Sequence, residues 1–279
     1  MAPFLTSSHD SIVSWYYLTK LNEKRNLVFS TYLTLNRKVY NGPVPKIDDF
    51  SYIERWLASA YCHGLPVVLL YDQLSPEFIS RYSSDLIHFV ESPPLFQNRT
   101  PNDRRFLLYK HLLFDEPREP FSAASHYIFT DAKDVIFLKN IFEFIRDHES
   151  NQTRIFCGND APASSKGFQV TIYRCLSAEL FELTGEHPSY NAGFLGGSRQ
   201  VIQQVLDRIS LLLSIVNSRK NCNMGVFNLA IRQLFQRDQI ISRGQMINGF
   251  FNSVHPGTFV AHKPHGNVVW EDCRLKRLD

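Results

Sequence analysis

The stretch that most constrains the fold is an apolar segment interrupted by two acids, His126–Leu138. Its first part, Tyr127–Phe129, is a short continuous apolar run, which is typical of a strand buried on both faces of a parallel sheet. Asp131 and Asp134 follow at the end of that run. Open α/β sheets bind ligands in the crevice beyond the carboxyl ends of their strands. We therefore expect both acids at a ligand-binding edge of the sheet.

The spacing of these two acids leaves two interpretations. Residues three positions apart cannot share one face of a flat strand, where the period is two. The carboxylates of Asp131 and Asp134 can therefore converge only if the chain turns between them. A converging pair would suit Mg²⁺ or Mn²⁺, which combine a few protein oxygens with substrate phosphate oxygens. The alternative is an ordinary turn in which both aspartates are solvated.

Segments that favour strands and helices alternate along the chain. β-branched and aromatic runs predict strands, whereas apolar residues three and four positions apart predict helices. The predicted strands are Leu27–Leu35, Val67–Tyr71, Leu86–Val90, Arg154–Gly158 and Thr258–Ala261. The predicted helices are Asp10–Lys24, Tyr52–His63, Pro76–Tyr82, Arg104–Leu113, Gln200–Val216 and Asn223–Leu234. This order is typical of βαβ units, so we expect one α/β domain over residues 1–279, with a mostly parallel, Rossmann-like sheet flanked by helices.

Two further segments could contribute to a site. Tyr190–Arg199 contains three glycines, which either let the backbone approach a ligand closely or simply permit a bend between a strand and a helix. The late segment His262–Gly266 holds two histidines and a lysine. A neutral imidazole can ligate a metal and a lysine can hold a phosphate, although a single histidine is more often a structural residue.

Composition excludes several classes of function. The net charge of +3 is too small for the concentrated basic surface that nucleic-acid binding requires, so we expect no nucleic-acid partner. No apolar run approaches the roughly 18–20 residues of a membrane span. The first ten residues lack the pattern of a secretory signal. We therefore expect a cytoplasmic protein, with a chain separated from a Golgi anchor as the alternative.

The cysteines and the sequons bear on the compartment of the protein. The five cysteines are scattered and form no Cys-x-x-Cys pair, which predicts neither a zinc site nor a disulfide framework. Two sequons begin at Asn98 and Asn151 and would matter only in a secretory compartment.

Taken in order, these pieces resemble the nucleotide-sugar-dependent glycosyltransferases of the GT-A fold, and the layout is most similar to glycogenin-like transferases. The segments that carry the resemblance are LVFSTYLT, NDRRFLLYKHLL, YIFTDAKDVIF, YNAGFLGG, NMGVFN and VAHKPHG, which together span residues 27–266. The resemblance implies transfer of a sugar from a nucleotide-diphosphate sugar, expected to be a UDP-sugar, to a glycan or another hydroxyl acceptor. It also implies dependence on Mn²⁺ or Mg²⁺.

The resemblance also implies roles for individual residues. The metal ligands would be Asp131, Asp134 and His262. The implied contacts to the donor are Thr31, Tyr32, Arg105, Asp131, Ala192, Gly193 and Lys263. To these we add Asp103, which stands at the position of the N-cap of the predicted helix Arg104–Leu113. We expect Asn191 to lie beside the donor sugar.

The sequence departs from the family pattern at three points. The acidic motif is Asp-x-x-Asp rather than the DXD motif Asp-x-Asp, the later helix begins Asn-Met-Gly without the family's acidic residue and glutamine, and His262 is directly followed by Lys263. These departures leave the stereochemical outcome open. If the reaction inverts, Asp160 is the candidate general base; if it retains, the leaving phosphate oxygen serves and Asn191 orients the sugar.

Two other functions compete with this one. A sugar nucleotidyltransferase would also use paired acids with Mg²⁺, but it normally has a glycine- and lysine-rich loop after the first strand, and Phe29–Arg37 has no glycine. A catalytically inactive binding module would keep the fold and bind nucleotide sugars without turnover.

Overall fold

The computed structural model describes residues 26–35, 45–149, 153–159, 175, 189–216, 220–242, 246–247, 257–263, 268–271 and 274–277. Within these residues the chain is an α/β protein with a mostly parallel central sheet flanked by helices, which confirms the predicted fold class. None of the described helices is long and apolar enough to cross a membrane. The helix predicted over Asp10–Lys24 lies outside the described residues.

The central sheet of the described chain has the strand order β3-β2-β1-β4-β7-β6-β8. Every neighbouring pair is parallel except those that involve β7, which is antiparallel to both β4 and β6. Its strands are β1 (Asn26–Tyr32), β2 (Val67–Tyr71), β3 (Ile87–Glu91), β4 (His126–Thr130), β6 (Ile155–Asn159), β7 (Tyr190–Ser198) and β8 (Ile240–Ile241). Two small antiparallel sheets pair β5 (Val135–Phe137) with β9 (Val260–His262) and β10 (Val268–Glu271) with β11 (Arg274–Arg277).

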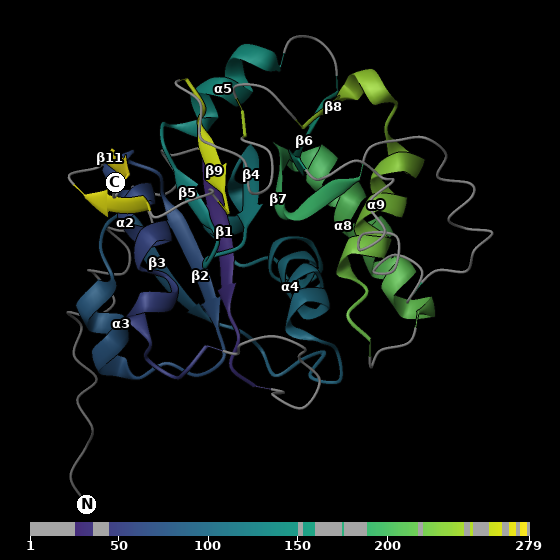
Figure 1. The fold of residues 1–279 in the computed structure, drawn as a ribbon. Helices are drawn as coiled ribbons and strands as arrows, with labels where there is room; N and C mark the ends of the chain where they lie inside the picture. Colours follow the sequence, from purple (N-terminus) through teal and green to yellow (C-terminus); the bar gives the residue numbers. More distant parts are fainter. Residues whose placement is uncertain are drawn as a thin grey trace, which may run out of the picture.

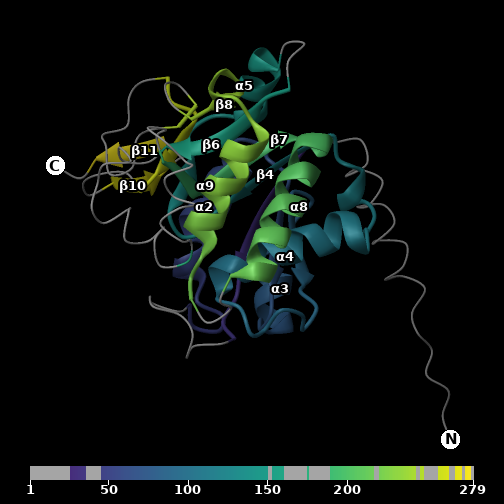
Figure 2. The same cartoon turned by 90° about the vertical axis from the view of Figure 1, so that its right-hand side faces the viewer.

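Helices cover both faces of the central sheet (Figures 1 and 2). The α-helices are α2 (Glu54–Cys62), α3 (Pro76–Tyr82), α4 (Pro101–Lys110), α5 (Ile141–His148), α8 (Arg199–Ile215) and α9 (Asn223–Leu234). A π-helical turn, His111–Asp115, extends α4, and short 3-10 turns lie at Phe50–Tyr52, Phe121–Ala123 and Arg237–Gln239. Figure 2 shows α4, α8 and α9 together on one side of the molecule.

The alternation of strand side chains divides the interior into two cores. On β1, Leu27 and Phe29 face the core beneath α4, α8 and α9, whereas Val28 faces the core beneath α2, α3 and α5. β4 repeats the pattern, since Phe129 faces the first core and Ile128 the second. A strand buried on both faces has no polar side, which explains why these strands read as continuous apolar runs.

The fold decides two points that the sequence left open. The chain turns at the two acids, because β4 before them belongs to the central sheet and β5 after them belongs to a separate small sheet. The glycine segment is not a bend, because Tyr190–Ser198 forms β7, the long antiparallel strand beside β4, and Arg199 begins α8. Glycine lets this strand pass close to its neighbours: a Cβ on Gly158 of β6 would lie 2.5 Å from the Asn191 carbonyl oxygen.

Candidate functional site

The candidate site is a cleft of about 390 Å³ at the carboxyl ends of β1 and β4. These strands flank the point where the strand order reverses, since β2 lies on one side of β1 and β4 on the other. Ligands of open α/β sheets bind at such a switch point. The lining residues are Ser30, Thr31, Leu33, Pro45, Tyr52, Pro101, Asn102, Arg105, Asp131, Ala132, Lys133, Asp134 and Lys263. The cleft therefore holds three cationic and two anionic side chains.

Asp131 follows β4 directly and is held by α4 and β7. Its backbone N–H donates to the carbonyl of Gly193 at 3.0 Å, and its Oδ1 accepts a hydrogen bond from the buried Arg105 guanidinium. The same guanidinium donates to the carbonyl of Ala192 at 2.8 Å. Burial raises the pKa of the Asp131 carboxyl, but the nearby charges, Arg105 foremost, outweigh it and leave the pKa below its usual value. Asp131 is therefore an anion at neutral pH.

The end of β4 is fixed by side chains from two other elements. The indole N–H of Trp56 on α2 donates to the hydroxyl of Thr130 at 2.7 Å. The hydroxyl of Ser30 on β1 donates to the Thr130 carbonyl at 2.6 Å. Because all three residues are buried, these bonds are shielded from water and hold the backbone immediately before Asp131 in place.

Asp134 is brought to the cleft by the pairing of β5 with β9. Val135 stands opposite His262 in this register, so the residue after β9, Lys263, comes to lie beside Asp134. The backbone N–H of Lys263 donates to the Asp134 carbonyl at 2.9 Å, and its Nζ lies 3.2 Å from Asp134 Oδ2. Lys263 has a φ of +46°, a conformation that costs energy for a residue with a side chain and that is often found at functional sites.

Several side chains of the site pack against the backbone of Gly193. A Cβ built on Gly193 would lie 2.6 Å from Asp131 Oδ2, 2.8 Å from His262 Cε1 and 2.9 Å from Asn191 Oδ1. Three side chains, one from the residue after β4, one from β9 and one from β7, therefore meet where this residue has none. The Asn191 Oδ1 also accepts the Gly193 N–H at 2.7 Å, which fixes the amide against its own strand.

His262 is buried and only 1% exposed. Burial lowers the pKa of its imidazole to about 4, although the charge of Asp131 acts in the opposite direction. The ring is therefore neutral at pH 7, and a neutral imidazole is the form that ligates metals.

These residues fit a divalent cation that is shared with a substrate. The described residues contain no group of three or more histidine, cysteine or acidic side chains arranged to hold a metal. A Mg²⁺ or Mn²⁺ ion bound through substrate phosphates needs only one or two carboxylates from the protein. Asp131 and Asp134 line the same cleft, and each side chain is 28% exposed. Arg105 binds Oδ1 of Asp131, whereas Oδ2 faces Gly193 on the side of His262.

The structure brings most of the sequence-predicted site residues together. Thr31, Arg105, Asp131, Asp134 and Lys263 line the cleft. His262, Asn191 and Gly193 lie immediately behind Asp131, and the Ala192 carbonyl binds Arg105. Asp160, the candidate base, lies outside the described residues.

Two predicted residues have other environments. Tyr32 is fully buried, and its hydroxyl bonds to the carbonyls of Lys46 and Asp49, so it holds the segment after β1 rather than facing the cleft. Asp103 is not the N-cap of its helix. Thr100 has that role, because its hydroxyl accepts the Asp103 N–H at 3.3 Å and Pro101 opens the helix.

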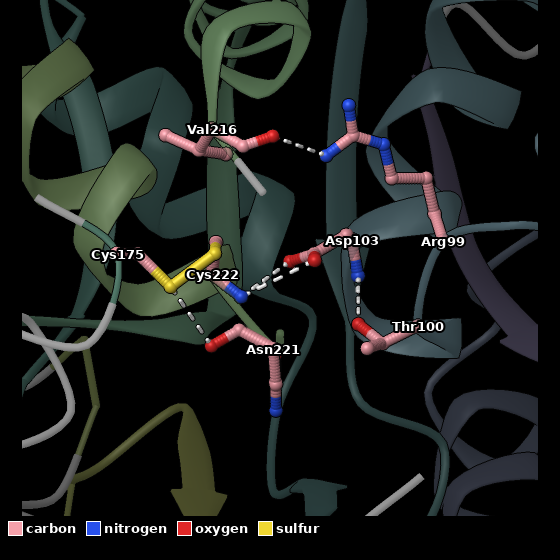
Figure 3. Close-up of a disulfide and its surroundings, with 7 residues drawn as sticks. All are labelled: Arg99, Thr100, Asp103, Cys175, Val216, Asn221 and Cys222. Carbon is pink, nitrogen blue, oxygen red and sulfur yellow. Dashed lines mark hydrogen bonds between the residues drawn. A yellow bond between two sulfur atoms is a disulfide. The ribbon is translucent and has the colours of Figure 1, made fainter. Parts of the chain in front are cut away.

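The Asp103 carboxylate serves a structural purpose. It is fully buried and accepts the backbone N–H of Cys222 through both oxygens, at 3.0 and 3.2 Å (Figure 3). Cys222 is in turn bonded to Cys175 through a disulfide that links residues 47 positions apart. Cys62 is disulfide-bonded as well, whereas Cys157 is free and buried. The scattered cysteines therefore do form disulfides, although their spacing predicted no disulfide framework.

Sequence reasoning missed several residues of the site. Tyr52, Asn102 and Lys133 line the cleft, with the Lys133 ammonium 6.0 Å from the centre of the Tyr52 ring. A buried ion pair also supports the cleft: Arg104 Nη1 lies 3.3 Å from Asp72 Oδ2. Asp72 accepts the backbone N–H groups of Thr34 and Leu35 beyond β1. Its place directly after β2 was the available signal, because polar residues at strand ends mark this edge of the sheet.

The fold and the cleft together define an α/β protein with a charged crevice at the switch point of its sheet. No protein-family model and no curated protein matches the chain. The assignment of a function therefore depends on the geometry of the cleft and on the resemblance seen in the sequence.

Proposed function

We propose that this chain is a metal-dependent glycosyltransferase that moves a sugar from a nucleotide-diphosphate sugar, a UDP-sugar by the resemblance, to a hydroxyl acceptor. The observation that carries the proposal is the convergence of Asp131, Asp134 and Lys263 on one cleft, with Gly193 and His262 packed directly behind Asp131. These residues come from three separate parts of the chain, and the fold brings them to a single edge.

The topology supports the same proposal. The motifs of the resemblance lie at β1, α4, β4, β7, α9 and β9, and all but the α9 motif contribute to the cleft or to the residues behind it. β7 runs antiparallel to β4, so its amino end lies at the edge where the parallel strands have their carboxyl ends. The Asn-Ala-Gly segment is at this end of β7 and therefore lies at the same edge. Fold alone does not determine chemistry, and it is these side chains that support the proposed activity.

The cleft residues match the electrostatic needs of glycosyl transfer. As the bond between the sugar and the diphosphate breaks, negative charge accumulates on the leaving group, and cations stabilise it. Lys263 and Lys133 are ammonium groups at the cleft, and Arg105 is a buried guanidinium that fixes Asp131. A divalent ion held by Asp131 and Asp134, with His262 adjacent, would supply further charge to the diphosphate.

The fate of the acceptor's proton separates two mechanisms. An inverting reaction needs a protein base, and Asp160 is the candidate from the sequence. A retaining reaction can use the leaving phosphate oxygen, and the Asn191 amide would then help to orient the sugar. Product stereochemistry distinguishes the two, because a retained anomeric configuration excludes a single displacement assisted by Asp160.

The proposal is tested by screening nucleotide sugars for slow hydrolysis in the presence and absence of Mn²⁺, with binding measured by calorimetry. We expect one donor to bind and to be hydrolysed only when metal is present. Asp134→Asn should abolish metal-dependent donor binding and turnover while the variant stays folded, because the carboxylate lies in the cleft and not in the core. Donor binding without turnover, even with acceptors supplied, would instead identify the inactive binding module.

A matched control uses a surface aspartate. Asp147 on α5 is 68% exposed and does not line the cleft. Asp147→Asn makes the same chemical change, and we expect normal donor binding and turnover. If Asp134→Asn also bound donor normally, the proposed metal and donor site would be wrong.

A further inference from the structure

The described chain carries an exposed asparagine in a turn that no part of the proposed function uses. Asn98 lies in the loop between β3 and α4 and begins the sequon Asn98-Arg-Thr100. The Arg99 N–H donates to the Phe96 carbonyl at 3.0 Å, which closes a turn with Asn98 inside it. Arg99 also donates to the carbonyl of Val216 at 3.3 Å, and this bond fixes the turn to the end of α8 (Figure 3).

The disulfides indicate where such a sequon would be used. Cys175–Cys222 is formed and Cys62 is bonded too, so most of the thiols outside the buried Cys157 are oxidised in this structure. Disulfides form and persist in the secretory pathway and outside the cell, and are rare in the cytosol. Closing each disulfide transfers two electrons and two protons from the thiols to a lumenal thiol oxidant. The disulfides therefore argue against the cytoplasmic location expected from the sequence.

We propose that Asn98 carries an N-linked glycan, acquired in the oxidising compartment where these disulfides form. In this reaction Nδ2 of Asn98 forms a bond to the anomeric carbon of a lipid-diphosphate-linked oligosaccharide. The carbon–oxygen bond to the diphosphate breaks, and the amide gives one proton to a base of the transferring enzyme. The proposal is independent of the chemistry of the cleft.

The burial of Thr100 sets the order of events. Thr100 is 1% exposed and its hydroxyl caps α4, so an enzyme that reads the sequon must act before this helix is complete. Asn98 itself is exposed in the folded chain, which leaves room for the attached glycan afterwards. Modification before folding and accommodation after folding are thus both compatible with the structure.

Phe96 provides a surface for the first sugar. It is the first residue of the turn that contains Asn98, two positions before it, and it is 36% exposed with a φ of +57°. Leu95 beside it is 37% exposed. The C–H face of a sugar ring is apolar, so covering the Phe96 ring with the first N-acetylhexosamine removes apolar surface from water. This explains an exposed pair of large apolar side chains in a loop.

The test expresses the full chain behind a cleavable secretory leader in eukaryotic cells and maps the peptide that contains Asn98. We expect treatment with peptide N-glycosidase to convert Asn98 to aspartate in the wild-type chain. The conversion should be lost completely in Asn98→Gln and in Thr100→Asn, and kept in Thr100→Ser. Thr100→Asn retains a good, uncharged helix cap while destroying the sequon, so it separates loss of the glycan from loss of α4 stability.

Two outcomes would overturn the inference. An unmodified Asn98 in secreted wild-type protein whose Cys175–Cys222 disulfide has formed would refute the site itself. For the role of Phe96, we expect the wild-type protein to lose thermal stability when the glycan is removed enzymatically, and Phe96→Ala to reduce that loss. An equal loss in the two proteins would show that the sugar does not pack on the ring.

Discussion

At the scale of single residues, the site depends on the absence of a Cβ atom at Gly193. Gly193 has no side chain, and Asp131, His262 and Asn191 occupy the space where one would be. Interiors are packed so tightly that even one added methyl group is felt by its neighbours. The geometry of the cleft floor therefore depends on Gly193 as directly as on the charged groups.

Gly193→Ala should consequently disable the site more than it destabilises the fold. The added methyl must displace Asp131 Oδ2 and His262 Cε1, so we expect loss of metal-dependent donor binding, with a cost in unfolding free energy of about 1–3 kcal/mol. Calorimetry with the donor and denaturant unfolding measure the two effects. Gly196→Ala on the same strand is the matched control, because its nearest contact is 3.3 Å away at Ile128 Cγ1. Equal losses of binding in both variants would contradict this account.

Asp103 gives a prediction about pH. Burial raises its pKa from 3.8 to about 6, although the Cys222 N–H acts in the opposite direction. Between pH 4 and 6 the folded chain keeps the Asp103 proton that the unfolded chain has released. The Asp103 contribution to the unfolding free energy therefore falls as pH rises through this window and stays low above it. Its full size is about 3 kcal/mol.

Asp103→Asn removes this pH dependence because an amide cannot ionise. We expect the unfolding free energy of the variant, relative to wild type, to rise between pH 4 and pH 7.5 by up to the same amount. Denaturant titrations at several pH values measure the difference, and Asp147→Asn should show no such trend. A difference between Asp103→Asn and wild type that stays constant with pH would refute the assignment.

At the scale of elements, the disulfide secures the start of α9. Cys222 immediately precedes α9 and is held by both Cys175 and the Asp103 carboxylate on α4 (Figure 3). Within α9, the side-chain amide of Asn228 accepts the backbone N–H of Tyr190 and donates to the Tyr190 carbonyl. The helix thereby connects the covalent crosslink to the strand that carries Gly193.

Removing the disulfide should lower stability substantially. A crosslink across 47 residues restricts the unfolded chain enough to contribute about 4 kcal/mol by the loop-entropy relation. We expect a loss of this size in the double variant Cys175→Ser, Cys222→Ser under non-oxidising, non-reducing conditions, measured by denaturant unfolding. Adding reductant should destabilise the wild type more than the double variant, whose remaining response reports the disulfide at Cys62. An equal response to reductant would show that this crosslink does not stabilise the fold.

At the scale of the whole molecule, ligand binding should be visible as stability. A donor that binds only the folded chain raises the unfolding free energy by about 2.7 kcal/mol when present at 100 times its dissociation constant. We expect nucleotide sugar and Mn²⁺ together to raise the melting temperature more than the sum of their separate effects, because they share one cleft. Thermal melts of wild type and Asp134→Asn test this. Strictly additive shifts in the wild type would argue against a shared site.

Local patterns were enough to predict most elements but not the arrangement between them. Val67–Tyr71, Pro76–Tyr82 and Asn223–Leu234 follow from periodicity alone and match β2, α3 and α9. The direction of β7 and the pairing of β5 with β9 depend on contacts between distant segments, which periodicity does not encode. Cysteine pairing has the same limitation, since connectivity cannot be deduced from spacing. The cap at Thr100 was predictable, because a threonine before a proline is a typical helix start.

The candidate site likewise combines residues that local patterns identified with residues that they did not. Asp131 and Asp134 were identifiable because two acids after a buried apolar run mark the edge of a sheet. Lys263 was noted as a possible phosphate contact from its segment, and Arg105 was expected only through the resemblance. Tyr52 and Lys133 were missed, because nothing local distinguishes them from ordinary surface residues.

The pairing of β5 with β9 has a consequence for the growing chain. Residues 26–130 already contain the four adjacent parallel strands β3, β2, β1 and β4, so half of the sheet can assemble early in synthesis. Gly193 is synthesised later, and His262 and Lys263 are synthesised only near the end of the 279-residue chain. Contacts between segments so far apart in sequence form slowly, because the intervening loop must close first. The site is thus completed last, and a chain cut short before β9 would keep the early sheet without the residues that pair with Asp134.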